Sequence, residues 1–123
     1  MAFPRILIAV PLLALGGFFP AVGPEPAATP PGVVGMEHED FAVKEVTVHR
    51  GDTLTFTNNS RYMHIIGPGR EGVLEQADGL PVRGRVLMPT NDTYITEPFD
   101  VPGTYYITCP MHPEMTVKVV VTE

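Results

Sequence analysis

The sequence predicts an all-β domain, an antiparallel sandwich or barrel, and three observations favour it. Short runs rich in Val, Thr, Tyr and Ile recur from about Val33 to the C-terminus, and these residue types are enriched in strands. Turn residues (Gly, Pro, Asn, Asp) close each run, as expected for successive strands. Helical periodicity is almost absent: the best place for a helical turn is residues 72–79 (GVLEQADG), which Gly79 would end.

The first two predicted strands follow each other closely. Residues 41–48 (FAVKEVTV) form a Val-rich run that the turn sequence Arg-Gly-Asp at 50–52 ends. In the next run, Leu54 and Phe56 alternate with threonines and are followed by Asn-Asn-Ser at 58–60. Apolar residues at every second position are typical of a strand with one buried face.

The later strands repeat this pattern. Residues 93–99 (TYITEPF) lead to a Val-Pro-Gly turn at 101–103, and residues 104–109 (TYYITC) follow it. The chain closes with residues 116–121 (TVKVVV), in which every second residue is valine and therefore lies on one face. We detect no internal repeat, and a length of 123 residues allows one such domain.

The N-terminal third has a different composition. Residues 6–22 carry no charge and follow Arg5, a pattern typical of an export signal. As a helix they would span about 25 Å, slightly less than the hydrocarbon core of a bilayer. We therefore assign residues 1–22 to a cleaved signal peptide or an uncleaved membrane anchor, with a buried core helix as the third alternative. Residues 23–35 read as a Pro-rich linker, and residues 36–123 as the folded domain, in the periplasm or another extracytoplasmic compartment.

Charge and cysteine content exclude several functions. The chain has 8 basic and 14 acidic residues, a net charge of −6, which argues against nucleic-acid binding because that requires clustered Lys and Arg. The single cysteine, Cys109, excludes a disulfide framework and all-cysteine zinc or iron–sulfur sites. It also excludes a two-copper centre with two bridging cysteines.

The chemistry is concentrated between the last two predicted strands. Residues 109–115 (CPMHPEM) bring a thiol, an imidazole and a thioether, on Cys109, His112 and Met115, into seven positions. Two histidines, a cysteine and a weak axial methionine define an electron-transfer copper site, and His64, which follows the Phe56 strand, can supply the second imidazole. The sequence therefore predicts one copper ion held by His64, Cys109, His112 and Met115, although zinc could also occupy such a site.

Each of these residues also has a simpler interpretation. Cys109 could be a small buried apolar residue, His64 a core histidine with satisfied hydrogen bonds, and Met115 plain core. The other methionines near these positions are interpreted as packing residues, and two other histidines as solvent-exposed. The packing methionines are Met63, Met88 and Met111, and the exposed histidines are His38 and His49.

From about Phe41 to Val121 the sequence resembles the cupredoxins, the small blue copper proteins, and is most similar to the amicyanin/plastocyanin branch. The resemblance rests on motifs in the right order: Gly-Asp at 51–52, His64, the Pro-Gly-Thr-Tyr-Tyr run at 102–106, and Cys-x-x-His-x-x-Met at 109–115. It implies an antiparallel Greek-key β-sandwich and a type 1 copper ion on the four residues named above. Three positions depart from the family. Met111 lies two residues after the cysteine, where proline is common. Ile65 follows the first histidine where Asn is common, and Pro110 follows the cysteine where Ser or Thr is common. The side-chain tie between the two ligand loops is then missing, and we expect the prolines of the 109–115 loop to provide its rigidity.

These observations predict an exported electron carrier, not an enzyme, that cycles between Cu(I) and Cu(II). We expect a monomer whose redox partners dock transiently near His112, with membrane attachment only through residues 6–22. The alternative is a copper-binding, delivery or resistance module that does not transfer electrons, because residues 106–113 (YITCPMHP) also resemble short heavy-metal-binding segments of copper exporters. A copper oxidase or nitrite reductase is disfavoured, since such enzymes need several domains and more histidines.

Overall fold

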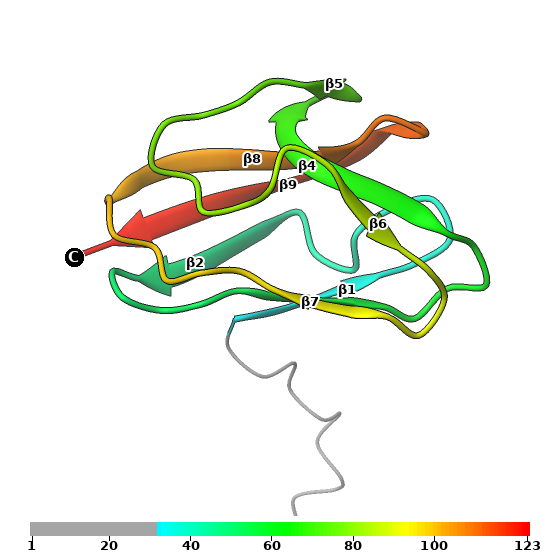
Figure 1. The fold of residues 1–123 in the computed structure, drawn as a ribbon, viewed down its shortest axis with the longest axis horizontal. Helices are drawn as coiled ribbons and strands as arrows, with labels where there is room; N and C mark the ends of the chain where they lie inside the picture. The colour runs from blue at the N-terminus through cyan, green and yellow to red at the C-terminus, as the bar shows by residue number, and fades with distance from the viewer. Residues whose placement is uncertain (1–31) are drawn as a thin grey trace, which may run out of the picture.

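The computed structural model describes residues 32–123, which form nine β-strands in two sheets (Figure 1). The first sheet has the order β1-β3-β7, and the second has the order β2-β9-β8-β4-β5, with β6 also paired to β4. The strands are β1 Val33–Met36, β2 Glu45–His49, β3 Thr55–Asn58, β4 His64–Arg70, β5 Val73–Leu74, β6 Val86–Met88, β7 Thr93–Ile95, β8 Gly103–Cys109 and β9 His112–Thr122.

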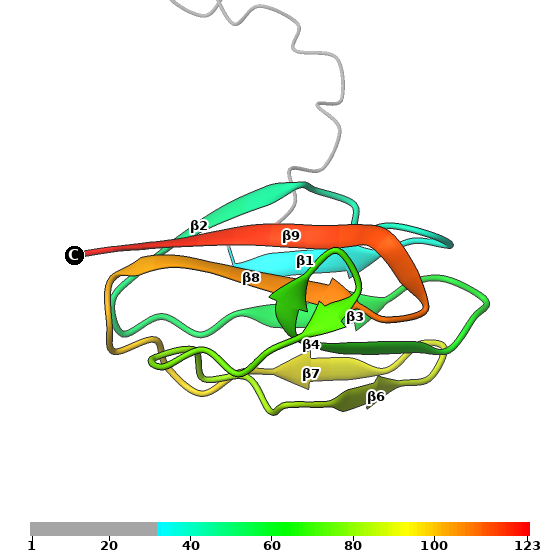
Figure 2. The same ribbon diagram turned by 90° about the horizontal axis from the view of Figure 1, so that it is seen from above.

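The predicted all-β sandwich is confirmed, but its pairing is mixed and not antiparallel throughout. β1 runs parallel to β3, and β2 runs parallel to β9, while the remaining pairs are antiparallel. Figure 1 shows β8 and β9 in one layer and β1 and β7 in the other, and Figure 2 looks from above through the first layer onto the second. Parallel neighbours cannot be joined by a tight hairpin, so local turn signals in the sequence carry no information about these two pairs.

The domain begins earlier than the sequence indicated. β1 starts at Val33, so residues 33–35, which were assigned to the linker, belong to the sandwich, and Val34 is fully buried. The segment just before this strand is rich in proline, so its composition indicated a linker and the start of the strand was not recognised. The predicted signal or anchor at 1–22 and the linker residues 23–31 lie outside the described residues. Within residues 32–123, no helix has the length and apolar character needed to cross a bilayer.

The predicted helical turn within residues 72–79 is wrong. Val73 and Leu74 form β5 and pair with the end of β4, so the segment starts as a hairpin. The turn of that hairpin contains Glu71 (φ 53°) and Gly72 (φ 80°). Two successive residues in the left-handed region form the turn that matches the twist of a hairpin, and this geometry is incompatible with entering a helix.

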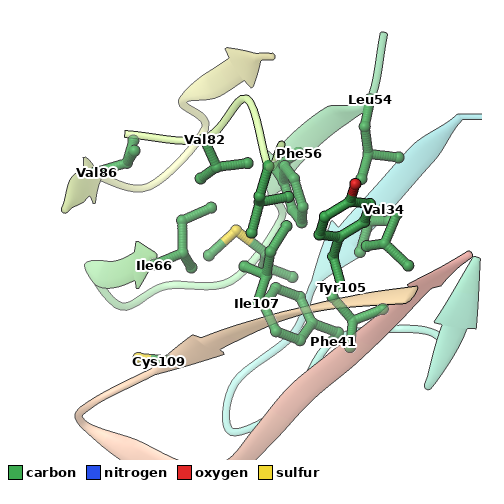
Figure 3. Packing of buried hydrophobic residues seen from close by; sticks show 14 of the residues in the cluster. Val34, Phe41, Leu54, Phe56, Ile66, Val82, Val86, Tyr105, Ile107 and Cys109 are labelled. Atoms are coloured by element: carbon green, nitrogen blue, oxygen red, sulfur yellow. The ribbon is translucent and has the colours of Figure 1, made fainter. Parts of the chain in front are cut away.

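The core lies between the two layers and is built from the alternating apolar residues of the predicted strands. Leu54 and Phe56 are fully buried, and the three valines of the 116–121 run are buried on one face, as predicted. Phe56 packs against Phe41, with ring centroids 5.9 Å apart. Figure 3 shows Phe41, Leu54 and Phe56 gathered in this cluster, with Cys109 at its edge where β8 ends.

The topology brings the two ligand-bearing segments to one end of the sandwich. β8 and β9 form a hairpin whose turn lies at the end opposite the C-terminus, and β4 begins at His64 at that same end (Figure 1). β4 pairs with β8 through Gly67 and Thr108. The predicted copper residues therefore come from three neighbouring strands of one sheet.

Replacing Phe56 with alanine tests the core. Because Phe56 is fully buried, Phe56→Ala should lower the free energy of unfolding by about 3–5 kcal/mol, through lost burial and the cavity left behind. Urea unfolding followed by circular dichroism measures this. Leu87→Ala, at a leucine that is 60% exposed, is the control and should change stability by no more than about 0.5 kcal/mol. Equal effects of the two substitutions would contradict the assigned core.

Candidate metal centre

His64 is the first residue of β4 and is fully buried, and its ring is fixed by two hydrogen bonds. Its Nε2 lies 2.8 Å from the carbonyl oxygen of Glu37, which directly follows β1, and 3.1 Å from the hydroxyl of Ser60. A buried imidazole without partners would be costly, so these contacts both stabilise the ring and set its direction.

Asn58, the last residue of β3, anchors this arrangement and is itself fully buried. Its amide nitrogen donates to the carbonyl oxygens of Tyr62 (2.7 Å) and Met88 (2.8 Å). Its amide oxygen accepts from the backbone N–H and the hydroxyl of Ser60, at 2.9 and 2.6 Å. Sequence reasoning interpreted Asn58 and Ser60 only as turn residues; the signal it missed was the placement of small polar residues just upstream of a buried histidine.

The hydrogen bonds determine which nitrogen of His64 is free. The Glu37 carbonyl can only accept, so Nε2 carries the hydrogen, and Nδ1 keeps its lone pair. Burial lowers the pKa of His64 below its ordinary value of 6.5, the Glu37 carbonyl partly opposes this, and the nearby His112 lowers the pKa further. His64 is therefore neutral at pH 7, the form in which an imidazole binds a metal.

Cys109 lies where Nδ1 of His64 points. It ends β8, is fully buried, and its Sγ is 4.0 Å from Nδ1 of His64, a residue 45 positions earlier in the chain. That distance is too long for a strong hydrogen bond, but it suits two donors of one ion. Two ligands that each lie about 2.0–2.3 Å from a shared metal are about 3.5–4 Å apart. The nitrogen–sulfur pair therefore fits a metal such as copper.

The other two predicted ligands lie in β9. His112 is half-buried, and its ring centroid is 5.7 Å from that of His64. Met115 is fully buried in the same core cluster as Cys109. The structure thus brings His64 close to both Cys109 and His112 in pairs. Within residues 32–123 no three His, Cys, Asp or Glu side chains together form a ready metal-binding group, so the four-residue ligand set stays a prediction.

The histidines and methionines that were not predicted as ligands differ in how well their predicted burial agrees with the structure. His38 and His49 are exposed, as predicted, and His38 packs edge-on against Tyr62 with centroids 3.9 Å apart. Met88 is buried, as a packing residue should be. The same interpretation is wrong for Met63 and Met111, which are 48% and 51% exposed: Met63 directly precedes β4, and Met111 lies in the β8–β9 turn.

Comparison with known proteins identifies the family of this chain. No family model matches the sequence. Amicyanin-alpha of Methylorubrum extorquens is 34% identical over 85 residues, which are 66% of this chain and 63% of that protein. A reduced amicyanin variant of known structure is 31% identical and superimposes with a TM-score of 0.58, over 72% of this chain and 79% of that one. The chain belongs to the cupredoxins. The chain spans less than two thirds of the length of the curated amicyanin that it matches.

Two further cupredoxin structures support the assignment to different degrees. An amicyanin variant in its reduced Cu(I) form at pH 4 is 31% identical, covering 76% of this chain and 84% of that one with a TM-score of 0.59. A purple cupredoxin from Nitrosopumilus maritimus has a TM-score of 0.58 over 74% of this chain and 99% of its own, but at 18% identity it shows the fold alone.

The tautomer of His64 can be tested in the metal-free cupredoxin. At pH 7 we expect the hydrogen on Nε2 and a lone pair on Nδ1, because the Glu37 carbonyl requires a donor. Nitrogen-15 NMR of the histidine side chains distinguishes the two ring nitrogens directly. A hydrogen on Nδ1 would mean that the ring does not present its lone pair to Cys109.

Proposed function

We propose that this cupredoxin is an exported, single-copper electron carrier whose ion is held by His64, Cys109, His112 and Met115. The observation that carries the proposal is the approach of Nδ1 of His64 to Sγ of Cys109, at 4.0 Å between two fully buried groups. Their nitrogen and sulfur donors, with a second imidazole and a thioether nearby in the fold, match the donor set of a blue-copper site.

An electron-transfer copper site needs donors that are held in fixed positions and shielded from water, and the arrangement of residues 32–123 is consistent with both needs. When bound, copper supplies a one-electron Cu(I)/Cu(II) couple. The chain holds its donors on strands: His64 is fixed by Glu37 and Ser60, and Cys109 is packed into the core. Because the sheet and not an ion fixes these side chains, their positions need little adjustment between oxidation states. Burial of Cys109 and Met115 keeps water away from both sulfur donors.

His112 is the proposed route for electrons between the ion and a partner. It is half-buried, whereas Cys109 and Met115 are closed off. Its neighbours in the chain, Pro110, Met111 and Pro113, are exposed. An apolar rim around one accessible ligand suits small, short-lived contacts with redox partner proteins, and a monomer suffices for this task.

The compartment follows from the sequence and the proposed task together. Residues 6–22 have the composition of an export signal, and Pro-rich residues after them would hold the domain away from a membrane if that segment is retained. The carrier would then act in the periplasm or another extracytoplasmic compartment, either released or tethered by its N-terminus.

The competing function is copper binding and delivery without electron transfer. Two exposed methionines near the ligand residues, Met63 and Met111, favour it because thioethers bind Cu(I). Against it stands the complete sandwich around His64 and Cys109, which delivery does not require. The following experiment separates the two functions.

Copper loading should give an intense visible absorption band from the Cys109 thiolate, and this band should disappear and return over cycles of reduction and oxidation. Cys109→Ser should abolish the band, since a hydroxyl is not the soft donor that the site needs. His49→Ala, at an exposed histidine that pairs with Thr122 at the far end of β9 from the ligands, is the matched control and should leave the spectrum unchanged. A colourless protein that binds Cu(I) and transfers it to a chelating protein would favour delivery instead.

The proposed electron route predicts a specific kinetic defect. Met111→Glu places a charge beside His112 and should slow electron self-exchange between protein molecules by about tenfold or more, because like charges now meet at the contact. Copper content should not change. NMR line broadening in mixtures of the reduced and oxidised protein measures the rate.

Val101→Glu provides the control for this experiment. Val101 is 50% exposed, close to the 51% of Met111, and it precedes β8 at the end of the sandwich opposite the β8–β9 turn (Figure 1). The same added charge at that position should leave self-exchange within about twofold of the original rate, because it lies outside the proposed contact. Equal slowing by both substitutions would remove His112 as the route.

A further inference from the structure

The β8–β9 hairpin contains a bulge that holds one of the proposed ligands. Thr108 pairs with Thr116, but the next residue of β8, Cys109, pairs with His112. Residues 113–115 of β9 therefore have no partners on β8. A bulge leaves backbone groups outside the ladder, and such groups need hydrogen bonds from elsewhere when they are buried. Met115 lies in this bulge and is fully buried.

Two threonine hydroxyls at the base of the bulge supply those hydrogen bonds. The hydroxyl of Thr108 donates to the carbonyl oxygen of Met115 at 3.1 Å. The hydroxyl of Thr116 lies 2.9 Å from that of Thr108 and 3.3 Å from the carbonyl oxygen of Pro113. Thr108 is fully buried, so its hydroxyl has no solvent to replace these partners.

The same hydroxyls receive hydrogen bonds from the β4–β5 turn. The backbone N–H of Gly72 donates to Thr108 at 2.9 Å, and that of Glu71 donates to Thr116 at 3.2 Å. The turn also packs directly on the bulge: a Cβ added to Gly72 would lie 3.2 Å from Cα of Pro113. β4 begins with His64 and ends at this turn, so the contacts connect the strand of the first ligand to the loop of the others.

We propose that these four residues form a threonine clamp (Glu71, Gly72, Thr108 and Thr116) that positions Met115 relative to Cys109. The proposal rests on the proposed function, because positioning matters only if both sulfurs bind copper. Each threonine has one hydroxyl hydrogen. Thr108 gives its hydrogen to Met115 and accepts from Gly72, so the backbone of Met115 is tied through one oxygen atom to a turn on another strand.

The threonine clamp supplies a connection between the two ligand loops, for which the sequence offered no side chain. Ile65 and Pro110 provide no side-chain tie between the ligand loops. A loosened bulge would let the Met115 thioether withdraw from the site. A weaker axial donor favours the reduced state, because the thioether donates electron density that stabilises Cu(II) more than Cu(I). Loss of the clamp should therefore raise the reduction potential. Thr108 and Thr116 are positioning residues in this scheme, since neither supplies a proposed ligand atom.

The metal-free protein provides the first test. Thr108→Val keeps the shape of the side chain but removes the acceptor of the Gly72 N–H, so hydrogen exchange at the Gly72 amide should accelerate about tenfold. Thr108→Ser keeps the hydroxyl and should keep the protection. Thr104→Val, at an exposed threonine of the same strand, is the matched control and should not change exchange at Gly72. Unchanged exchange in Thr108→Val would overturn the clamp.

The copper-loaded protein provides the second test, by voltammetry and visible spectroscopy. Thr108→Val should raise the potential and change the spectrum, and Thr108→Ser should restore both. If Thr108→Val does not fold, Thr116→Val replaces it: exchange at the Glu71 amide should accelerate and the potential should rise. A potential that is unchanged or lowered while exchange accelerates would overturn the positioning role. If the unsubstituted protein shows no thiolate–copper band, the proposed function fails, whereas the exchange result still decides whether the clamp exists.

Discussion

The hydrogen bond from Nε2 of His64 to the Glu37 carbonyl is the constraint on which the site depends. It fixes the tautomer and the ring direction together, and only then does Nδ1 face Cys109. The carbonyl is in place because Glu37 directly follows β1, and β1 is held parallel to β3 in the other sheet. The direction of one buried ring therefore depends on a strand that lies far from it in the chain.

One sheet carries the proposed ligands, and the other carries the groups that orient His64. All four proposed ligands come from the second sheet, on β4, β8 and β9. The groups that orient His64 come from the first sheet and its connections: Glu37 follows β1, and Asn58 ends β3 and holds Ser60. Packing of the layers through the apolar core thus fixes ligands and orienting groups relative to each other. Metal-ligating histidines are commonly held in this way through their second nitrogen.

Sequence patterns predicted the parts of this structure that are local. Alternating apolar residues identified β3, β8 and β9, and the spacing of residues 109–115 identified the loop that carries three proposed ligands. β4 was not predicted, because its run HIIGPGR contains glycine and proline and is buried on both faces without alternation. The partners of His64 could not be predicted either. They depend on which strands lie side by side, and no periodicity in the sequence reports that.

The ligand loop shows why rigidity and hydrogen bonding are separate requirements. Pro110 and Pro113 restrict the backbone of the 109–115 segment, as the sequence led us to expect, but proline supplies no N–H group. A bulge with proline in it has fewer donors for its own carbonyls than an ordinary strand would have. The donors must then come from side chains. The hydroxyl of Thr108 donates to the carbonyl oxygen of Met115, and the single hydroxyl hydrogen of Thr116 is shared between Thr108 and the carbonyl oxygen of Pro113. The prolines that stiffen the loop thus make it dependent on hydroxyls outside it, and through those hydroxyls on the turn that ends β4.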